Sequence, residues 1–413
     1  MTNIVRLPGS KRCPRLFWRQ DDVDRNRNNA HLGRLPVSFA RGQGACLYDA
    51  DGNRYLDALA GIAVVGLGHA HPAVTQAIQR QAETLLHTSN LYEIPLQEQL
   101  ARRLCEISGM ENAFFANSGA EANEAALKIA RRYGNERGIE NPQVIAMDGS
   151  FHGRTMATLT ATGNRKVHAG FEPLLGGFLR APYNDVPRVA NIAENNNGVV
   201  AIFVEPVLGE GGVQIPADDY LLKLREICDD HDWLLILDEV QTGNGRTGRY
   251  FAYQHANILP DALTTAKGLG NGVPIGVCLA RGPAAETLVA GTHGSTFGGN
   301  PLVCAAALAV IGELTDGGVI ERAAELGKRI INALAKNLDG LNHVRDVRGK
   351  GMMIAVELEN PCTDLIQKAL SKRLLLNVTT DNVLRLLPPL NLTDDEADEI
   401  VDIVTSLVRE AGS

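Results

Sequence analysis

The sequence predicts an α/β fold, with a large domain built on a mostly parallel β-sheet and a smaller α+β domain built from both ends of the chain. From about residue 95, short apolar strand patterns alternate with helical patterns, which is typical of a parallel sheet covered by helices. After Gly340 the pattern changes to short strands and one final amphipathic helix, which indicates a second architecture.

In the large domain, the expected strands are short apolar runs. They are Ala113–Asn117, Val144–Met147, Val199–Val204, Trp233–Leu237 and Ile275–Leu279. Helical periods separate several of them, at Glu121–Tyr133 and Tyr220–Asp230. Apolar residues at helical spacing also predict one long helix over residues 303–338, which would bridge the two domains.

The smaller domain is expected to combine the two ends of the chain. Its predicted elements are the strands Val344–Val347, Met352–Glu357 and Leu384–Leu387, the helix Asp394–Glu410, and the opening strands Val37–Phe39 and Ala45–Tyr48. The predicted division is an N-terminal extension (1–30), the N-terminal segment of the small domain (31–70), the large domain (71–310) and the C-terminal small domain (311–413).

Composition excludes several functions. The chain has 413 residues, 40 basic against 48 acidic, and a net charge of −8, so neither nucleic acid nor an anionic membrane is an expected partner. No apolar run reaches the roughly 18 to 20 residues that span a bilayer. The seven cysteines are scattered without a CxxC spacing. We therefore expect reduced thiols and a cytoplasmic protein, with no disulfide framework and no metal site.

The first 20 residues contain five basic and no acidic residues. A mitochondrial transit peptide has this bias. However, Pro8 and Pro14 interrupt an amphipathic helix, and acidic residues follow from Asp21 onward. An ordinary N-terminal extension is the favoured interpretation.

The end of the first strand of the large domain is followed by a helix start. Ser118 and Glu121 have the spacing of a capping box. The amides of Gly119 and Ala120 would then face outward at the helix N-terminus, where a phosphate can bind. A well-capped structural helix is the alternative, and a nucleotide P-loop is excluded because its GxxxxGK[ST] pattern is missing.

Two charged residues follow other predicted strands. Asp238 ends the apolar run at 234–237, and Lys267 lies in DALTTAKGLGNG between small residues. Taken singly, Asp238 could be a turn residue and Lys267 a surface lysine. In an open α/β sheet, however, ligands bind beyond the carboxyl ends of the strands, where both residues are expected.

A phosphate cradle, a carboxylate and a lysine together fit pyridoxal 5′-phosphate (PLP). This cofactor needs a phosphate anchor, a lysine that attaches to its aldehyde, and an acid beside its pyridine nitrogen. Asp238 would hold the protonated nitrogen, because an ion pair at 4 Å contributes roughly 4 kcal/mol at an effective dielectric of 20. A desolvated Lys267 would be a nucleophile toward carbonyl groups.

Six segments also resemble one known family. They are FANSGAEANEAALKIAR (115–131), FHGRT (151–155), EPVLGEGG (205–212), DEVQTGNGRTG (238–248), AKGLGNGVPIG (266–276) and GSTFGGNPL (294–302). Together they resemble the class III aminotransferases, with every motif in order and at the family's spacing from about residue 35 onward. The match of six ordered motifs is very specific for the family.

The resemblance implies a fold-type I PLP-dependent transferase that works as a homodimer with shared active sites. It implies Lys267 and Asp238 as catalytic residues. The residues that it implies for cofactor binding are Ser118, Gly119, Ala120, Phe151, Asp238, Gln241, Lys267 and Thr296. In this interpretation Phe151 stacks on the ring, Gln241 bonds near the phenolic oxygen, and Thr296 reaches the phosphate of the neighbouring subunit's cofactor.

The resemblance further implies transamination between N-acetylornithine and 2-oxoglutarate, in arginine biosynthesis. Arg154 would bind the distal carboxylate of either amino donor, and Arg385 the α-carboxylate of glutamate only. Arginine suits both roles because its planar fork binds a carboxylate through two bonds. Glu210 would neutralise Arg385 while acetylornithine is bound, and Ser295 would lie beside the substrate.

Departures from the family concern specificity. Leu208 stands where glutamine is often found, and Asn244 where an apolar residue is common. The segment NAHLGRLPVSF lacks the tyrosine with which ornithine aminotransferases meet a free α-amine, which favours a substrate with a blocked amine. Succinylornithine, ornithine or 4-aminobutyrate aminotransferase is the alternative. An aminomutase, a decarboxylase and a PLP-binding regulator are less favoured, because an aminomutase needs no glutamate site and the basic N-terminal segment is too short for a DNA-binding domain.

Overall fold

The computed structural model describes residues 33–412 of the chain, which divides into a unit of residues 1–38 and a unit of residues 39–413. The predicted extension over residues 1–30 lies outside the described residues. In the first unit, the Val37 amide donates to the Leu35 carbonyl, 2.9 Å away. The expected strand Val37–Phe39 is therefore wrong: Pro36 lacks an amide hydrogen, and the first strand, β1, begins only at Phe39.

Seven strands form the main sheet of the second unit, in the order β4-β10-β9-β8-β7-β5-β6. Their bounds are β4 (Asn112–Ala116), β5 (Gln143–Met147), β6 (Phe178–Ala181), β7 (Val199–Val204), β8 (Leu234–Asp238), β9 (Ala262–Thr265) and β10 (Gly276–Ala280). Strand β10 is antiparallel to both of its neighbours, and the other pairs are parallel. The predicted mostly parallel sheet is confirmed, although β6 and β9 were not expected.

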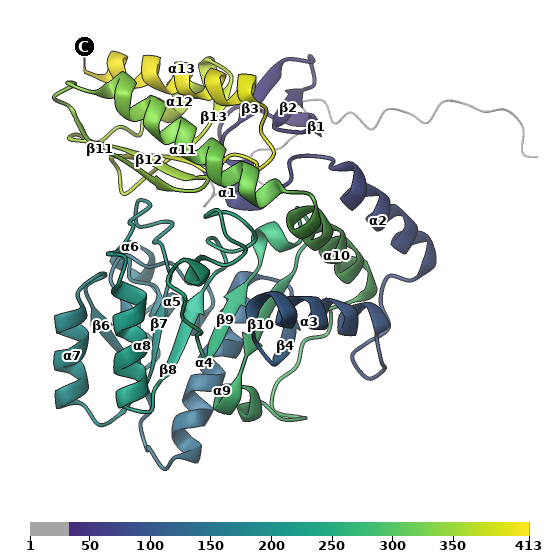
Figure 1. Ribbon diagram of the computed structural model, residues 1–413, viewed down its shortest axis with the longest axis vertical. Helices are drawn as coiled ribbons and strands as arrows, with labels where there is room; N and C mark the ends of the chain where they lie inside the picture. The colour runs from purple at the N-terminus through teal and green to yellow at the C-terminus, as the bar shows by residue number, and fades with distance from the viewer. Residues whose placement is uncertain (1–32, 413) are drawn as a thin grey trace, which may run out of the picture. The chain divides into compact units, whose positions relative to one another are not determined.

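Helices cover both faces of this sheet (Figure 1). Alternate strand residues face opposite sides, as the two-residue period of a strand requires. Ile236 packs with α4 (Gly119–Glu136) on one side, whereas Leu235 and Leu237 join the cluster that contains α3 (Pro95–Ser108), α8 (Tyr220–Asp230) and α10 (Pro301–Asp316). Shorter or more peripheral helices are α1 (Ala60–Ala63), α2 (Pro72–Thr84), α5 (Met156–Ala161), α6 (Arg165–His168), α7 (Val186–Asn195) and α9 (Gly282–Thr287).

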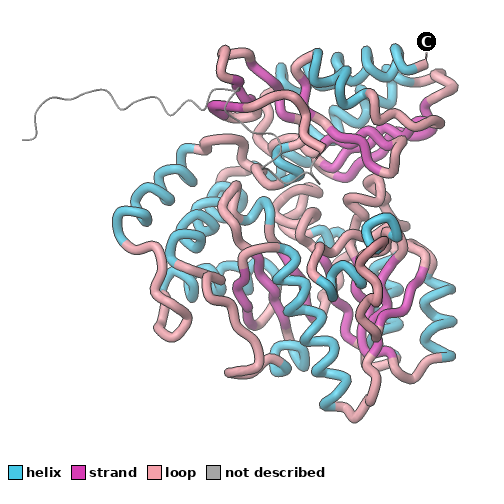
Figure 2. The backbone as a smooth tube through the Cα atoms, turned by 180° about the vertical axis from the view of Figure 1, so that it is seen from behind, coloured by secondary structure: helices cyan, strands magenta, loops and turns pink. Residues whose placement is uncertain are grey.

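Two four-stranded sheets lie close to the C-terminal helices (Figure 2). One has the order β1-β2-β3-β13 and the other β11-β12-β15-β14. Their bounds are β1 (Phe39–Gln43), β2 (Cys46–Asp49), β3 (Arg54–Asp57), β11 (Val344–Lys350), β12 (Met353–Leu358), β13 (Leu374–Leu375), β14 (Asn377–Thr379) and β15 (Val383–Leu386). Strand β13 pairs with β3, so the opening strands pack with the C-terminal segment as predicted.

The long helix expected over residues 303–338 is wrong. It is two helices, α10 and α11 (Val319–Leu338), bent by 67°. Gly317 and Gly318 separate them, and Gly318 has a φ of +67°, a left-handed conformation that glycine adopts without strain and that interrupts a right-handed helix. Within residues 33–412 no single helix has the length and apolar composition to cross a membrane, but the bent α10–α11 pair meets that test on length and composition.

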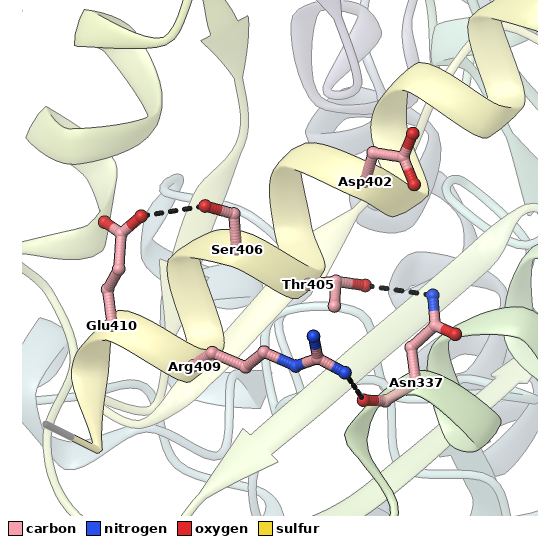
Figure 3. A pocket seen from close by; sticks show the side chains of 6 residues that line it. All are labelled: Asn337, Asp402, Thr405, Ser406, Arg409 and Glu410. Carbon is pink, nitrogen blue, oxygen red and sulfur yellow. Dashed lines mark hydrogen bonds between the residues drawn. The ribbon is translucent and has the colours of Figure 1, made fainter.

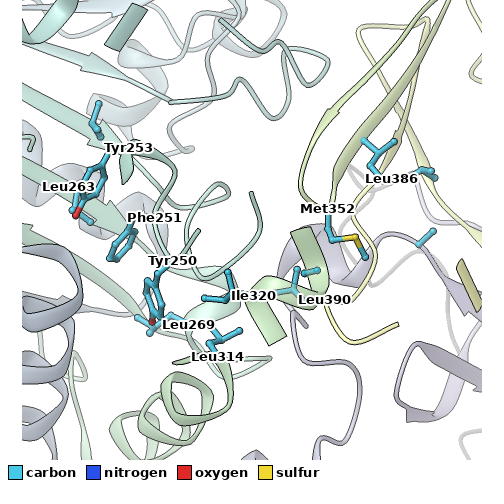
Figure 4. Close-up of a cluster of buried hydrophobic side chains, with 14 of the residues drawn as sticks. Tyr250, Phe251, Tyr253, Leu263, Leu269, Leu314, Ile320, Met352, Leu386 and Leu390 are labelled. Carbon is cyan, nitrogen blue, oxygen red and sulfur yellow. The ribbon is translucent and has the colours of Figure 1, made fainter. Parts of the chain in front are cut away.

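One buried cluster connects the main sheet to the smaller ones. It includes Leu263 of β9, Tyr250 and Phe251 of the segment between β8 and β9, Ile320 of α11 and Leu386 of β15 (Figure 4). The helices α12 (Leu365–Ser371) and α13 (Asp394–Ala411) complete this part of the chain. Because the core is continuous, the division at residues 70 and 310 stays a prediction.

Candidate active site

The carboxyl ends of the parallel strands converge on one cavity. Ser118 follows β4, Glu205 follows β7, Asp238 ends β8, and Lys267 lies two residues beyond β9. Strand ends of this direction meet at one edge of the sheet, which is where open α/β sheets bind ligands. The cavity has a volume of about 270 Å³ and is lined by Gly119, Ala120, Asn123, Phe151, His152, Gly153, Arg154, Glu205, Glu210, Asp238, Val240, Gln241 and Lys267.

Asp238 is buried and held by three donors. Its Oδ2 accepts from Asn123 Nδ2 at 2.8 Å and lies 2.7 Å from His152 Nδ1, and its Oδ1 accepts from the Val240 amide at 3.0 Å. The Thr264 hydroxyl in turn donates to Asn123 Oδ1 at 2.6 Å. This network fixes the orientation of a carboxylate that is only 3% exposed.

The hydrogen-bond pattern assigns the proton of His152. Its ring stacks on Phe203 at a centroid distance of 4.0 Å, and its Nε2 is buried without a hydrogen-bond partner among residues 33–412. An N–H at Nε2 would have no acceptor, so the proton belongs on Nδ1, where Asp238 accepts it. His152 therefore donates to Asp238 through Nδ1.

Lys267 is buried in a strained turn. It begins the short 3-10 turn Lys267–Leu269 with a φ of +44°, which non-glycine residues rarely adopt. Burial lowers the pKa of its ammonium and Arg385 adds to that, against the opposing charges of Glu210, Asp238 and Glu205. A lysine with a lowered pKa has a larger fraction of the neutral, nucleophilic amine.

The N-terminus of α4 opens into the cavity. Ser118 caps it by accepting from the Glu121 amide at 3.2 Å. The expected capping box is only half formed: the Glu121 carboxylate accepts from the backbone and side chain of Asn117, not from the Ser118 amide. The Glu121 carboxylate bonds to Asn117 because the backbone and side-chain amides of Asn117 offer two donors. The amides of Gly119 and Ala120 lie in the first helical turn, where no intrahelical acceptor exists.

Glu205 is a buried carboxylate that also lines the cavity. It accepts from the Phe151 amide at 2.8 Å and from the Gly209 amide at 3.1 Å, so it ties together the loops after β5 and β7. Burial and, to a smaller extent, the charge of Asp238 raise the pKa of Glu205 to about 8, against these two hydrogen bonds and the charge of Lys267.

Arg385 and Glu210 form an ion pair at the other end of the cavity. Arg385 Nη1 lies 2.8 Å from Glu210 Oε1 and 3.5 Å from Gln241 Oε1, and its Nε donates to Asn377 Oδ1 at 3.2 Å. The guanidinium is fully buried, yet its Nη2 has no hydrogen-bond partner among the described residues. A buried cationic donor without a partner is suited to an anionic ligand.

The Glu210 side chain is 34% exposed, in contrast to Arg385. Burial alone would raise its pKa, but the charge and hydrogen bond of Arg385, with Lys267 and Gln241, bring it below its usual value. Glu210 is therefore ionised at neutral pH. Gly209 allows the Gln241 side chain to lie close to the loop that carries Glu210, because a Cβ on Gly209 would lie 2.3 Å from Gln241 Oε1.

The comparisons with known proteins agree on one family. The family model for class III aminotransferases matches residues 28–408. The chain is a class III aminotransferase. It is 55% identical to acetylornithine aminotransferase from Nitrosomonas europaea over 375 residues, covering 91% of this chain and 95% of that protein.

Solved structures have the same fold as this class III aminotransferase. An ornithine aminotransferase from Toxoplasma gondii, with PLP at partial occupancy in its active site, matches with a TM-score of 0.91 and 35% identity, covering 96% of this chain and 97% of that one. An acetylornithine aminotransferase from Elizabethkingia anophelis matches with a TM-score of 0.85 and 30% identity, covering 94% and 98%. The predicted fold class and family are thus confirmed.

The structure brings most of the predicted site residues of this aminotransferase together. Arg154 lines the cavity with its guanidinium 5.5 Å from the centroid of the Phe151 ring. Ser295 and Thr296 do not line it: they border a second hollow of about 500 Å³ with Asn117, whose Nδ2 donates to Ser295 Oγ at 3.2 Å. Within one chain, these two residues are separate from Lys267.

Three of the cavity residues of the aminotransferase that were not expected have polar side chains. Asn123, His152 and Glu205 all lie within the six family motifs, but their side chains act on Asp238 or on neighbouring loops, which no local pattern reveals. The signal that could have found them is the polar residue itself, in a segment otherwise rich in small or apolar residues.

A hollow of about 440 Å³ between α11 and α13 is lined by Asn337, Asp402, Thr405, Ser406, Arg409 and Glu410 (Figure 3). Its polar groups bond one another, as in the 2.7 Å contact from Ser406 Oγ to Glu410. Across residues 33–412 no group of three His, Cys, Asp or Glu side chains could hold a metal ion.

Proposed function

We propose that the chain transfers the side-chain amino group of N-acetyl-L-ornithine to 2-oxoglutarate, with PLP as cofactor. The products are N-acetyl-L-glutamate 5-semialdehyde and L-glutamate, and the reaction belongs to arginine biosynthesis. Relatives at 45% to 55% identity are acetylornithine aminotransferases. The observation that carries the proposal is the ion pair between the buried Arg385 and Glu210, because Glu210 lines the same cavity as Lys267.

The cavity residues fit PLP. The amides of Gly119 and Ala120 would hold its phosphate at the N-terminus of α4. Gly119 has to be small, because a Cβ there would lie 2.7 Å from Val240 Cγ1. Asp238 would face the pyridine nitrogen with the lone pairs of Oδ1 that Val240 leaves free, and Phe151 would stack on the ring. Gln241 would bond near the phenolic oxygen, and Lys267 would attach to the aldehyde.

The chain's own residues have distinct tasks in this chemistry. When bound, PLP supplies an electron sink for the carbon that loses a proton. Lys267 Nζ would move that proton, since its lowered pKa leaves a larger fraction of the amine neutral and able to accept it. Asp238, oriented by its hydrogen bonds with His152 and Asn123, would hold a proton on the ring nitrogen.

Two amino donors have to use the same cavity. Acetylornithine presents an amine remote from its carboxylate, whereas glutamate presents an amine adjacent to one. Arg154 would bind the distal carboxylate of either donor, and Arg385 would bind the α-carboxylate of glutamate. Glu210 would cover Arg385 during the acetylornithine half-reaction and move away for glutamate, for which its partial exposure leaves room.

Steady-state kinetics with four amines test this function. We expect the highest kcat/KM with 2-oxoglutarate for acetylornithine, followed by succinylornithine, with ornithine and 4-aminobutyrate well below. A higher kcat/KM for succinylornithine would assign the alternative acyl group. Preference for ornithine or 4-aminobutyrate would contradict the proposed substrate while leaving the family unchanged.

We also propose a homodimer with shared active sites, to which Thr296 would contribute across the interface. Its support is an exposed apolar surface beside Thr296: Leu91, Tyr92 and Phe297 are 87%, 69% and 59% exposed. Asn90 joins the two segments by donating to the Ser295 carbonyl at 2.9 Å. Exposed apolar surface of this kind marks interaction sites.

Subunit exchange tests the dimer. Lys267→Ala chains and chains disabled at Thr296 are each expected to be inactive. Heterodimers verified by mass would regain one intact site if Thr296 acts across the interface. Verified heterodimers without recovered activity would place Thr296 in the site of its own subunit.

Two further proposals concern organisation. A large domain over residues 71–310 and a small domain from residues 31–70 and 311–413 are supported by the three separate sheets. A cytoplasmic location is supported by cysteines without disulfide partners among the described residues, namely Cys46, Cys105, Cys228, Cys278, Cys304 and Cys362. Limited proteolysis and fractionation would test them.

A further inference from the structure

Asn244 lies buried in the loop that follows β8, six residues after Asp238. Only 4% of it is exposed, and its φ of +55° is in the left-handed region. Asparagine tolerates this region better than most residues with a side chain. The position therefore accommodates asparagine locally, but tolerance of the backbone does not explain where its side chain points.

The Asn244 amide is directed at the segment that ends in Lys267. Its Nδ2 donates to Thr265 Oγ1 at 2.9 Å and to the Ala266 carbonyl at 3.1 Å. These are the two residues directly before Lys267. The carbonyl of Ala266 can only accept a hydrogen bond, so the NH₂ group and not Oδ1 has to face it.

Asn244 also contacts the chain on the other side of Lys267. A Cβ placed on Gly268 would lie 3.3 Å from Asn244 Cβ. The loop of Asn244 thus packs against the residues before and after Lys267, which itself has the strained φ of +44°. A strained turn persists only where its surroundings hold it in place.

The other end of the amide is unsatisfied. Asn244 Oδ1 is buried without a hydrogen-bond partner among residues 33–412. A buried acceptor without a partner lowers stability, so an apolar side chain would avoid this cost. Residues that lower stability without an evident packing gain are expected at functional positions.

We propose that Asn244 is a positioning residue for Lys267: its amide holds the turn from Thr265 to Lys267 so that Nζ faces the cofactor aldehyde. The proposal rests on the proposed function, since it assumes that Lys267 attaches to PLP. Asn244 itself touches no reacting atom. It links the Asp238 loop to the Lys267 turn, and so couples the two residues that act on the cofactor.

The test compares Asn244→Leu with Asn257→Leu. Asn257 has a nearly identical φ of +52° but is exposed. Both variants therefore place leucine in a left-handed turn. Protein freed of cofactor is mixed with PLP, reduced with borohydride at set times, and the fraction of modified Lys267 is measured by peptide mass. The absorbance of the bound cofactor before reduction gives the attached fraction at equilibrium.

We expect Asn244→Leu to slow attachment at Lys267 by about tenfold or more and to leave more cofactor bound but unattached. Asn257→Leu should attach at the wild-type rate even if its unfolding temperature falls as much. Asn244→Asp provides a second variant in case leucine prevents folding. It keeps the size and backbone tolerance of asparagine but places an oxygen against the Ala266 carbonyl, and should slow attachment as well.

The outcomes separate the two proposals. Wild-type protein that does not attach PLP at Lys267 would overturn the proposed function. Wild-type attachment with an unchanged rate and absorbance in the folded Asn244 variants would overturn the positioning role alone. Slowing in Asn244→Leu and Asn257→Leu to the same extent would also overturn it, because backbone strain would then explain the effect.

Discussion

The two ends of the active-site cavity are held in different ways. At one end, Asp238 accepts hydrogen bonds from Asn123, His152 and the Val240 amide, all within 3.0 Å, and is 3% exposed. At the other end, the partly exposed Glu210 meets Arg385 through one 2.8 Å contact, and Arg385 Nη2 has no partner among the described residues. The first end is built to stay fixed, and the second can change partners.

This difference matches two chemical needs. A carboxylate that stabilises a ring nitrogen acts the same way in both half-reactions, so it benefits from preorganised donors. Arg385 would bind the α-carboxylate of glutamate but no group of acetylornithine. It therefore needs a neutralising carboxylate that can move away when glutamate binds. A buried arginine whose partner is removed would otherwise be a strongly destabilising charge.

The largest effect should come from the fixed end. Lys267→Ala is expected to bind PLP without covalent attachment and to lose at least about 10⁴-fold in turnover, because one residue supplies both nucleophile and proton carrier. Absorbance of the bound cofactor and a product assay measure the two losses. Normal turnover without added amines would show that Lys267 is not the catalytic lysine.

A smaller loss is expected for Asp238→Asn. The amide keeps the size of the carboxylate but removes the counter-charge of the ring nitrogen, so both half-reactions should slow by roughly 10²- to 10⁴-fold. Single-turnover absorbance with each amine measures this. Equal slowing of the two halves would support a fixed end, whereas near-full activity would reduce Asp238 to a turn residue.

The fixed end was also the more predictable one. An apolar run indicated the strand before Asp238, and the carboxyl edge of such a sheet is where ligands bind. The strand before Lys267 was not expected, and the small residues around Lys267 identified it instead. The donors to Asp238 were missed. His152 and Asn123 come from other segments, and only the fold brings them to the carboxylate.

Local competition caused the errors. The apolar spacing across residues 303–338 resembles one helix, and it does not reveal that Gly318 adopts a left-handed conformation. Ser118 and Glu121 have capping-box spacing, but the Glu121 carboxylate accepts from the two donors of Asn117 instead. Local hydrogen bonds and backbone conformation decide such cases, and the spacing of residue types alone does not encode them.

At the changeable end, Arg385→Ala should affect the two donors unequally. Glutamate loses the charge-assisted bonds to its α-carboxylate, which contribute about 1.5 to 3 kcal/mol, so its half-reaction should weaken by roughly 10- to 150-fold. Acetylornithine places no carboxylate there and should be largely spared. Separate single-turnover measurements decide this, and equal losses would indicate that Arg385 has a structural role only.

The smallest expected effect concerns stability and pH. The pKa of Glu205 is raised to about 8 in the folded chain by burial and by Asp238, so the folded state holds a proton that the unfolded state loses above its ordinary pKa. Stability from this group is present at low pH and is lost as pH rises through about 8. Between about pH 5 and 8, the free energy of unfolding of the cofactor-free protein should fall less in Glu205→Gln than in the wild type, by on the order of 2 kcal/mol. Urea unfolding across that range measures it, and an unchanged pH slope would contradict the assignment.

The contrast between a fixed and a changeable end is tested most directly by Glu210→Ala, with the two half-reactions followed separately by single-turnover absorbance. The variant leaves Arg385 permanently uncovered. The glutamate half-reaction should become faster or tighter, by up to roughly 10- to 150-fold, because glutamate no longer displaces an ion pair. The acetylornithine half-reaction should lose efficiency against an uncovered cation. If both half-reactions shift equally and in the same direction, Glu210 is a structural loop residue and the account is wrong.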